Sequence, residues 1–85
     1  MEIVFTKQAK KDFEKIKANS VLLKKVQALL TLLESNPFET PPSYEKLAGF
    51  EHVYSRRINV QHRLIYQVYE DKKVIKVIRM WTHYE

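Results

Sequence analysis

The chain has 85 residues, which is enough for one hydrophobic core and excludes two separately folded domains. It has no cysteine, so a disulfide framework and a thiolate metal site are excluded, and its three histidines lack the spacing of zinc ligands. Fifteen Lys and Arg residues against ten Asp and Glu give a formal net charge of +5, which fits either a polyanionic partner, nucleic acid above all, or a basic surface that serves only for solubility.

The first part of the chain predicts one strand followed by two helices. Residues 3–6 (IVFT) form a short β-rich run, and Thr6 can cap a helix. The apolar positions of that helix follow helical spacing: Ala9, Phe13 and Ile16. Residues 19–20 interrupt the pattern and offer a second cap, and the next helix should end near residues 36–37. Its apolar stripe comprises Leu22, Val26, Leu29, Leu30 and Leu33.

The opposite faces of both predicted helices carry lysine. Seven lysines and no arginine occur here: Lys7, Lys10, Lys11, Lys15, Lys17, Lys24 and Lys25. The simpler interpretation is a solvated helix face. The alternative is a face that follows a phosphate backbone.

Residues 36–49 predict a connecting loop, because they hold all three prolines and the only glycine. Long loops in compact domains often carry function, and this one contains Glu45 and Lys46. Three strands should follow, at residues 53–58, 62–69 and 74–80 or 81, with hairpin connections at 59–61 and 70–73.

Alternation in the middle one of these strands places Leu64, Tyr66 and Val68 on the face toward the helices. The element order is βααβββ, which indicates an α+β fold. We expect a single domain over residues 1–85, with a helical hairpin on one face of a largely antiparallel sheet.

The arginines all lie in the second half of the chain: Arg56, Arg57, Arg63 and Arg79. An arginine presents a planar fork that matches phosphate, so this region is a candidate contact surface. Alternation puts Arg56 and Arg57 on opposite faces, so one of them should face the core or the sheet margin. Each arginine could instead pair with a carboxylate, such as Glu45, Glu51 or Glu70. Three arginines in one hairpin favour anion binding.

The C-terminal residues 80–85 (MWTHYE) are unusually aromatic for a chain end. An unperturbed histidine titrates near neutral pH, as a phosphodiester reaction requires of a proton donor, so His83 is a candidate for that role. The simpler interpretation is that His83 and Tyr84 only pack at the sheet edge.

Five segments, taken in order, resemble the YoeB/Txe branch of the RelE superfamily of bacterial toxins. They are residues 37–39 (PFE), 44–47 (YEKL), 54–59 (YSRRIN), 61–66 (QHRLIY) and 83–84 (HY). The resemblance spans nearly the whole chain, and the SRRI and HRLIY block combined with the terminal HY is specific. It implies a microbial-ribonuclease-like fold and a ribosome-dependent mRNA endoribonuclease that needs no cofactor and no metal.

Residue by residue, the resemblance implies catalytic roles for Glu45, Arg63 and His83. Metal-free RNA cleavage needs a base for the ribose 2′-OH, a cation for the phosphorane and an acid for the leaving 5′-oxygen. Glu45, Arg63 and His83 would supply these groups in that order.

Further residues are expected to bind substrate. Tyr84 would stack a base or orient the phosphate. Additional contacts to the RNA would come from Arg56, Arg57 and Lys46. Ser55, which lies beside Arg56, is interpreted as structural.

The resemblance also implies partners. These are a cognate antitoxin of the YefM/Axe kind, the ribosome with its mRNA, operator DNA only through the antitoxin complex, and a second copy of the chain in a homodimer. No apolar run reaches the length of a membrane span, and the N-terminal residues lack the basic region of a signal peptide. We therefore expect a cytoplasmic protein without a membrane partner.

Two other functions fit the sequence. A non-catalytic RNA- or ribosome-binding module would show the same basic sheet, and a corepressor that only binds an antitoxin would have the same fold. Glu45, His83 and Tyr84 are the residues that separate the enzyme from these alternatives.

Overall fold

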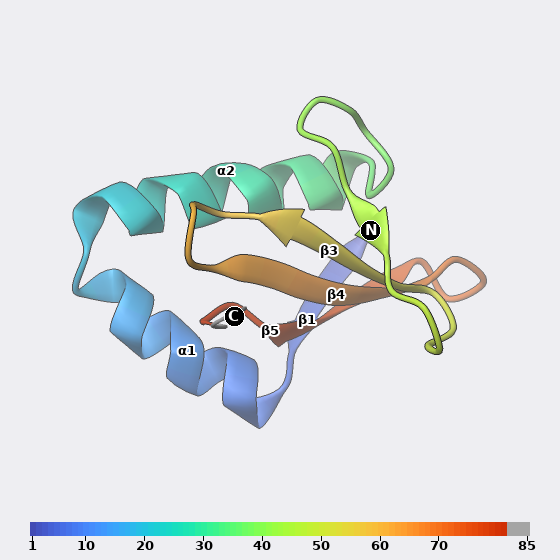
Figure 1. Cartoon of the computed structure of the whole chain (residues 1–85). Helices are drawn as coiled ribbons and strands as arrows, with labels where there is room; N and C mark the ends of the chain where they lie inside the picture. Colours follow the sequence, from blue (N-terminus) through green and yellow to red (C-terminus); the bar gives the residue numbers. More distant parts are fainter. Residues whose placement is uncertain (82–85) are drawn as a thin grey trace.

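The computed structural model describes residues 1–81 and contains two helices and five strands. In chain order they are β1 (Glu2–Phe5), α1 (Lys7–Lys17), α2 (Ser20–Ser35), β2 (Glu45–Lys46), β3 (Val53–Arg57), β4 (Arg63–Tyr69) and β5 (Val74–Arg79). The two helices form a hairpin against one face of the sheet (Figure 1). The predicted α+β architecture is confirmed.

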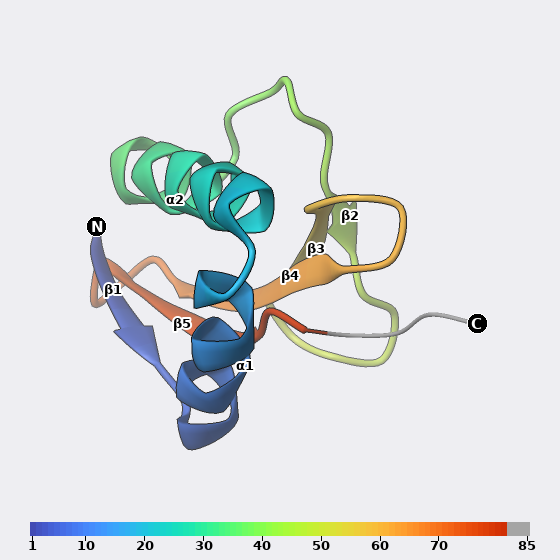
Figure 2. The ribbon, with the colours of Figure 1, turned by 90° about the vertical axis from the view of Figure 1, so that its left-hand side faces the viewer.

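The five strands form one sheet in the order β1-β5-β4-β3-β2. The pairs β2–β3, β3–β4 and β4–β5 are antiparallel, whereas the pair β1–β5 is parallel. The sheet is therefore mixed but mostly antiparallel. β1 and β2 form its two edges, which lie on opposite sides of the molecule (Figure 2).

Side-chain caps start both helices where the sequence predicts them. Thr6 Oγ1 accepts a hydrogen bond from the backbone N–H of Ala9 at 3.0 Å and donates one to the carbonyl of Ile78 at 2.9 Å. Asn19 Oδ1 accepts from the backbone N–H of Leu22 at 3.1 Å. Such caps satisfy N–H groups that have no partner inside the helix. Thr6 additionally ties the start of α1 to β5.

The core lies between the helix pair and the sheet. As predicted, the face of β4 toward the helices is buried and carries Leu64, Tyr66 and Val68. The predicted stripe of α2 is buried except at Leu30, which is only half-buried and lines a surface hollow beside Phe5 and Phe13. Leu30 differs from Leu29 because one residue rotates the side chain by about 100° around the helix axis.

The predicted loop over residues 36–49 contains a short strand, which the sequence does not predict. In β2, Glu45 pairs with Ser55 and Lys46 pairs with Tyr54 of β3. Two residues are too few to show a periodic pattern, so only the neighbouring strand defines this element. The pairing fixes Glu45 at the edge of the sheet. Within residues 1–81, no helix is long and apolar enough to cross a membrane.

Candidate active site

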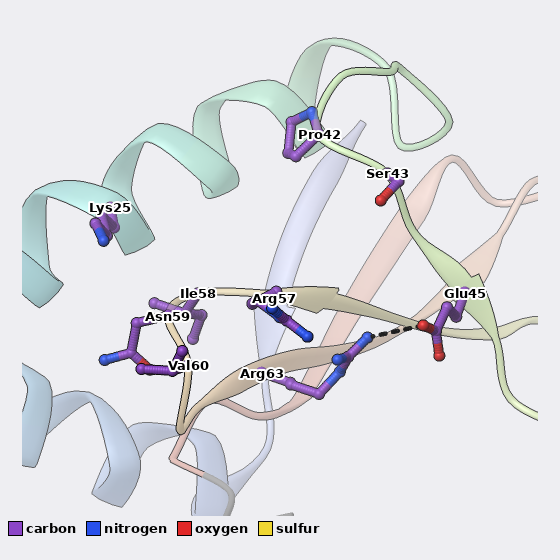
Figure 3. A pocket seen from close by; sticks show the side chains of 9 residues that line it. All are labelled: Lys25, Pro42, Ser43, Glu45, Arg57, Ile58, Asn59, Val60 and Arg63. Atoms are coloured by element: carbon purple, nitrogen blue, oxygen red, sulfur yellow. Dashed lines mark ion pairs between the residues drawn. The ribbon is translucent and has the colours of Figure 1, made fainter.

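A cavity of about 470 Å³ opens where the β3–β4 hairpin, β2 and α2 meet (Figure 3). Its lining residues come from α2 (Lys25), from the segment before β2 (Pro42 and Ser43), from β2 (Glu45), from the end of β3 and the hairpin turn (57–60), and from β4 (Arg63). We call this the site cavity. It brings together three of the predicted functional residues, Glu45, Arg57 and Arg63.

Glu45 and Arg63 form an ion pair inside the site cavity. Arg63 Nη2 lies 3.4 Å from Glu45 Oε1, and the two residues come from strands on either side of β3 (Figure 3). The Glu45 side chain is 72% exposed and that of Arg63 only 19%. The carboxylate is thus open to a ligand, while the guanidinium is held in place by the sheet.

Ser55 fixes the orientation of Arg63. The Ser55 side chain is buried, and its Oγ accepts a hydrogen bond from Arg63 Nε at 2.7 Å. Ser55 also pairs in register with Glu45, so one residue of β3 adjoins both partners of the ion pair. The structural interpretation of Ser55 is therefore correct, and its task is to position Arg63.

Arg57 adds a second cation next to Arg63. The two residues pair directly across β3 and β4, so their side chains share one face of the sheet. Arg57 is exposed, and Lys25 reaches the same cavity from α2. Like charges directly opposite each other, as Arg57 and Arg63 are, destabilise a sheet. Glu45 is the only carboxylate among the residues that line the cavity. The site cavity therefore carries an excess of positive charge suited to an anionic ligand.

Arg56 lies inside the protein, although the sequence predicts it as a substrate contact. Its Nη2 donates to the carbonyls of Pro37 and Glu39 at 2.9 and 2.8 Å, its Nη1 to the carbonyl of Pro42 at 2.6 Å, and its Nε to the hydroxyl of Tyr66 at 2.9 Å. The residue is fully buried. Arg56 therefore holds the segment that leads into β2 and is not part of the site cavity.

Tyr66 completes this buried cluster. Burial raises the pKa of the Tyr66 hydroxyl above its ordinary value, and the hydrogen bond from Arg56 offsets only part of that rise. The hydroxyl stays neutral and lies 3.4 Å from the carbonyl of Pro37, a distance at which it donates weakly. Arg56 and Tyr66 together act as a clamp on residues 37–42.

Three predicted residues lie apart from the site cavity or outside the described part of the chain. Lys46 is exposed on β2, but it lines a different hollow together with residues 47–51. His83 and Tyr84 fall outside residues 1–81, so their roles stay predictions.

A buried carboxylate that the sequence does not single out anchors the end of β5. Asp12 Oδ2 accepts hydrogen bonds from Arg79 Nε at 3.0 Å and from the backbone N–H groups of Met80 and Trp81 at 2.9 and 3.2 Å. Gln8 donates to Asp12 Oδ1 at 3.0 Å. Burial by itself raises the pKa of the Asp12 carboxyl, but these hydrogen bonds outweigh burial, and the pKa lies below its ordinary value.

Trp81, the last described residue, has two further contacts. Its ring stacks on that of His62 at a centroid distance of 4.1 Å, and Lys15 Nζ lies 5.9 Å from the Trp81 ring. Trp81 is thus held both by α1 and by the β3–β4 hairpin. It lies two positions before His83 and three before Tyr84 in the sequence.

The sequence as a whole matches a known toxin family. The model of the ParE toxin of the type II toxin–antitoxin system parDE matches residues 3–85. The chain belongs to this toxin family. The comparison of the toxin with curated protein sequences gives no significant match.

Solved structures of YoeB toxins superpose on the toxin over almost its full length. A YoeB/ParE toxin from Agrobacterium tumefaciens gives a TM-score of 0.88 at 28% identity, covering 99% of this chain and 100% of that chain. A YoeB–YefM complex from Staphylococcus aureus gives 0.81 at 34% identity, with coverage of 99% and 98%. The YoeB dimer from the same organism gives 0.84 at 34% identity and the same coverage. The resemblance to YoeB toxins and the RelE-like fold are confirmed.

Proposed function

We propose that the toxin is an endoribonuclease that cleaves ribosome-bound mRNA through attack of a ribose 2′-OH on the adjacent phosphodiester. The observation that carries the proposal is the ion pair of Glu45 and Arg63, at 3.4 Å, in an exposed cavity with excess positive charge. A carboxylate and a guanidinium side by side are the base and the electrostatic partner that this reaction requires.

Glu45 acts as the general base. Its exposed carboxylate takes the proton of the 2′-OH while the 2′-oxygen forms a bond to phosphorus. The ion pair with the neighbouring Arg63 holds this carboxylate in the site cavity. The hydrogen bond from Arg63 Nε to Ser55 Oγ fixes the orientation of the guanidinium that would bind the phosphate.

Arg63 and Arg57 stabilise the phosphorane. The extra negative charge of the transition state develops on the non-bridging oxygens, and a fixed guanidinium in a preformed site stabilises that charge without reorganisation. Arg63 is the better fixed of the two, since it is mostly buried and bonded to Ser55. Arg57, exposed on the same face, contacts the substrate backbone.

His83 is the general acid in this proposal, on the strength of the family resemblance. It donates a proton to the 5′-oxygen as the bond from phosphorus to that oxygen breaks, which leaves a 2′,3′-cyclic phosphate and a 5′-OH. Tyr84 stacks a base or orients the phosphate. The hydrogen bonds from Met80 and Trp81 to Asp12 support this role, because they fix the backbone up to two positions before His83.

The proposed partners follow from the similar structures. The Staphylococcus aureus YoeB occurs in a complex with YefM and as a dimer. We extend both to the toxin, which would pair with a cognate antitoxin of the YefM/Axe kind and with a second copy of itself. The antitoxin segment that covers Arg57 and Lys25 should be acidic, and operator DNA would be bound only through the antitoxin complex.

The test is cleavage of mRNA on translating ribosomes, read by primer extension, with wild type, Glu45→Gln and His83→Ala. Each substitution should lower the cleavage rate by about 10²-fold or more, because each removes one proton-transfer group. Wild-type protein that leaves ribosome-bound mRNA intact would refute the proposed activity.

Two controls separate chemistry from binding and folding. Ribosome pelleting should show nearly unchanged affinity for both variants, and thermal unfolding should show unchanged stability, since Glu45 is exposed. Full cleavage by both variants would show that Glu45 and His83 are not the proton-transfer groups. Ribosome binding by wild type without any cleavage would instead indicate the non-catalytic RNA-binding module.

A further inference from the structure

A second hollow, of about 320 Å³, continues from the site cavity toward the C-terminal half of α2. The two share four lining residues, Lys25, Pro42, Arg57 and Ile58. The second hollow adds Ala28, Leu29 and Leu32 from α2. We call it the α2 subsite. It is continuous with the place where the phosphodiester would be cleaved.

The composition of the α2 subsite differs from that of the site cavity. It contains no carboxylate, and its floor is apolar. The floor is formed by Ala28, Leu29, Leu32, Pro42 and Ile58. Lys25 and Arg57 are its two charged residues, and both are exposed. Within residues 1–81, neither forms an ion pair with a carboxylate. An apolar floor with two available cations at the rim fits a ligand that is flat and apolar on one side and anionic on the other.

We propose that the α2 subsite binds the nucleotide next to the scissile phosphate, with its base on the apolar floor and its phosphate between Lys25 and Arg57. The inference rests on the proposed function, because it takes the ligand of the site cavity to be RNA. A polynucleotide whose scissile phosphate lies at Arg63 must continue out of the site cavity. The hollow that shares Arg57 with that cavity offers the continuing chain both charge and apolar surface.

This assignment separates Lys25 from the other helix lysines. Lys24 is its neighbour on α2 and is also exposed, but it lines neither the site cavity nor the α2 subsite. Lys25 is therefore a substrate-binding residue, whereas Lys24 contributes only to the general positive field. The matched pair of substitutions Lys24→Gln and Lys25→Gln removes the same charge at adjacent positions.

The first experiment titrates isotope-labelled toxin with a trinucleotide whose 2′-hydroxyls are replaced by 2′-O-methyl groups, so that it cannot be cleaved. Backbone amide signals of Ala28, Leu32 and Ile58 should shift together with those of Arg57 and Arg63. Lys25→Gln should weaken binding by about fivefold and Lys24→Gln by less than about twofold, since only Lys25 contacts a phosphate. Equal losses for the two variants, or signal shifts confined to Arg63 and its neighbours, would overturn the assignment.

A second pair of variants tests the floor. Ala28→Glu and Gln27→Glu each add one carboxylate at an exposed position of α2, but only position 28 lines the α2 subsite. Ala28→Glu should abolish the signal shifts on α2, and Gln27→Glu should retain them. Thermal unfolding of both variants checks that the helix is intact. Trinucleotide binding by Ala28→Glu as tight as by Gln27→Glu would exclude a base from this floor.

The proposed function and the α2 subsite can fail separately. If wild-type toxin cleaves ribosome-bound mRNA and Lys25→Gln behaves as Lys24→Gln does, the subsite is wrong and the nuclease stands. If wild-type toxin does not cleave but the trinucleotide shifts the α2 signals in a Lys25-dependent way, the nuclease is wrong and the α2 subsite stands as a site that binds a nucleotide without cleavage. If an acidic peptide shifts these signals and the trinucleotide does not, the hollow is a protein-docking site and the inference is overturned.

Discussion

Two adjacent arginines have opposite roles in this toxin. Arg56 is fully buried and donates to three carbonyls and one hydroxyl, whereas Arg57 is exposed on the opposite face of β3. Strand alternation predicts this division from the sequence, since consecutive side chains point to opposite faces. It does not predict which arginine is buried, because the acceptors of Arg56 are backbone carbonyls that no side-chain pattern reveals.

We expect Arg56→Ala to lower the free energy of unfolding by about 3 kcal/mol, because buried carbonyls of residues 37–42 would lose their donor. Arg57→Ala should change it by less than about 0.5 kcal/mol, since that side chain is exposed. Urea unfolding of the two variants measures both values.

The two variants should rank in the opposite order for their affinity for RNA, measured per folded molecule: Arg57→Ala should lower this affinity more than Arg56→Ala does. Arg57→Ala removes a contact that the proposed function assigns to the substrate, so its affinity for RNA should fall although its stability does not. A large loss of stability in Arg57→Ala would mean that its guanidinium supports the fold and not the ligand.

Most elements of this fold can be predicted from the sequence, but their arrangement cannot. The helix caps at Thr6 and Asn19 and the three later strands are local features, and each lies within two residues of the prediction. The parallel pairing of β1 with β5 and the existence of β2 depend on residues far apart in the chain. No local pattern contains that information.

Between elements, Asp12 is the strongest connection that the sequence does not reveal. The apolar spacing of α1 passes through Ala9, Phe13 and Ile16, and an aspartate between them normally faces water. Here Asp12 is fully buried, because the N–H groups of Met80 and Trp81 and the guanidinium of Arg79 satisfy its oxygens. α1 is thus bonded to the end of β5 through one carboxylate.

Asp12→Asn should destabilise the toxin by about 2 to 4 kcal/mol near pH 7, because a charged acceptor of several hydrogen bonds is replaced by a neutral amide. The pKa of Asp12 is lower in the folded chain than in the unfolded chain, so the unfolded chain binds the proton first as the pH falls. The contribution of Asp12 is therefore fully present above the unfolded-state pKa of about 3.9 and is lost as the pH falls through the folded-state value.

Urea unfolding of wild type and Asp12→Asn at several pH values measures this difference. The gap between them should be constant from about pH 5 to pH 7 and should narrow below about pH 4. Glu14→Gln is the control, since Glu14 lies on the same helix with an exposed side chain and pairs only with Lys17 among the described residues. A gap that does not change with pH would show that the Asp12 charge is not what stabilises the end of β5.

For the whole molecule, the location of the charge matters more than its total of +5. The site cavity and the α2 subsite together expose Lys25 and Arg57, both without a carboxylate partner among residues 1–81. Lys72 and Lys73 lie in the turn at the opposite end of β4. A ligand that follows the cavities would meet the first pair and not the second.

RNA binding can be measured with the His83→Ala variant, which should not cleave the RNA. Its affinity for a single-stranded RNA should fall more than about tenfold between 50 and 200 mM salt, because counterions are released on binding. Arg57→Ala should reduce the slope of log affinity against log salt by about 0.7, the value for one lost phosphate contact. Lys72→Ala should leave the slope unchanged. Fluorescence anisotropy with a labelled oligonucleotide measures all three, and an affinity that does not vary with salt would contradict an electrostatic interface.

The pairing of β1 with β5 has a consequence for how the toxin is made. β1 is the first strand to leave the ribosome and β5 is the last, yet the N–H of Glu2 bonds to the carbonyl of Lys73 and that of Thr6 to Val77. β5 also lies between β1 and β4, so the sheet stays in two parts until residues 74–79 have emerged. Closing so long a loop comes late in folding. A nascent copy therefore has no complete sheet before residues 74–79 have left the ribosome, and under the proposed function this delay would limit cleavage by chains that are still being synthesised.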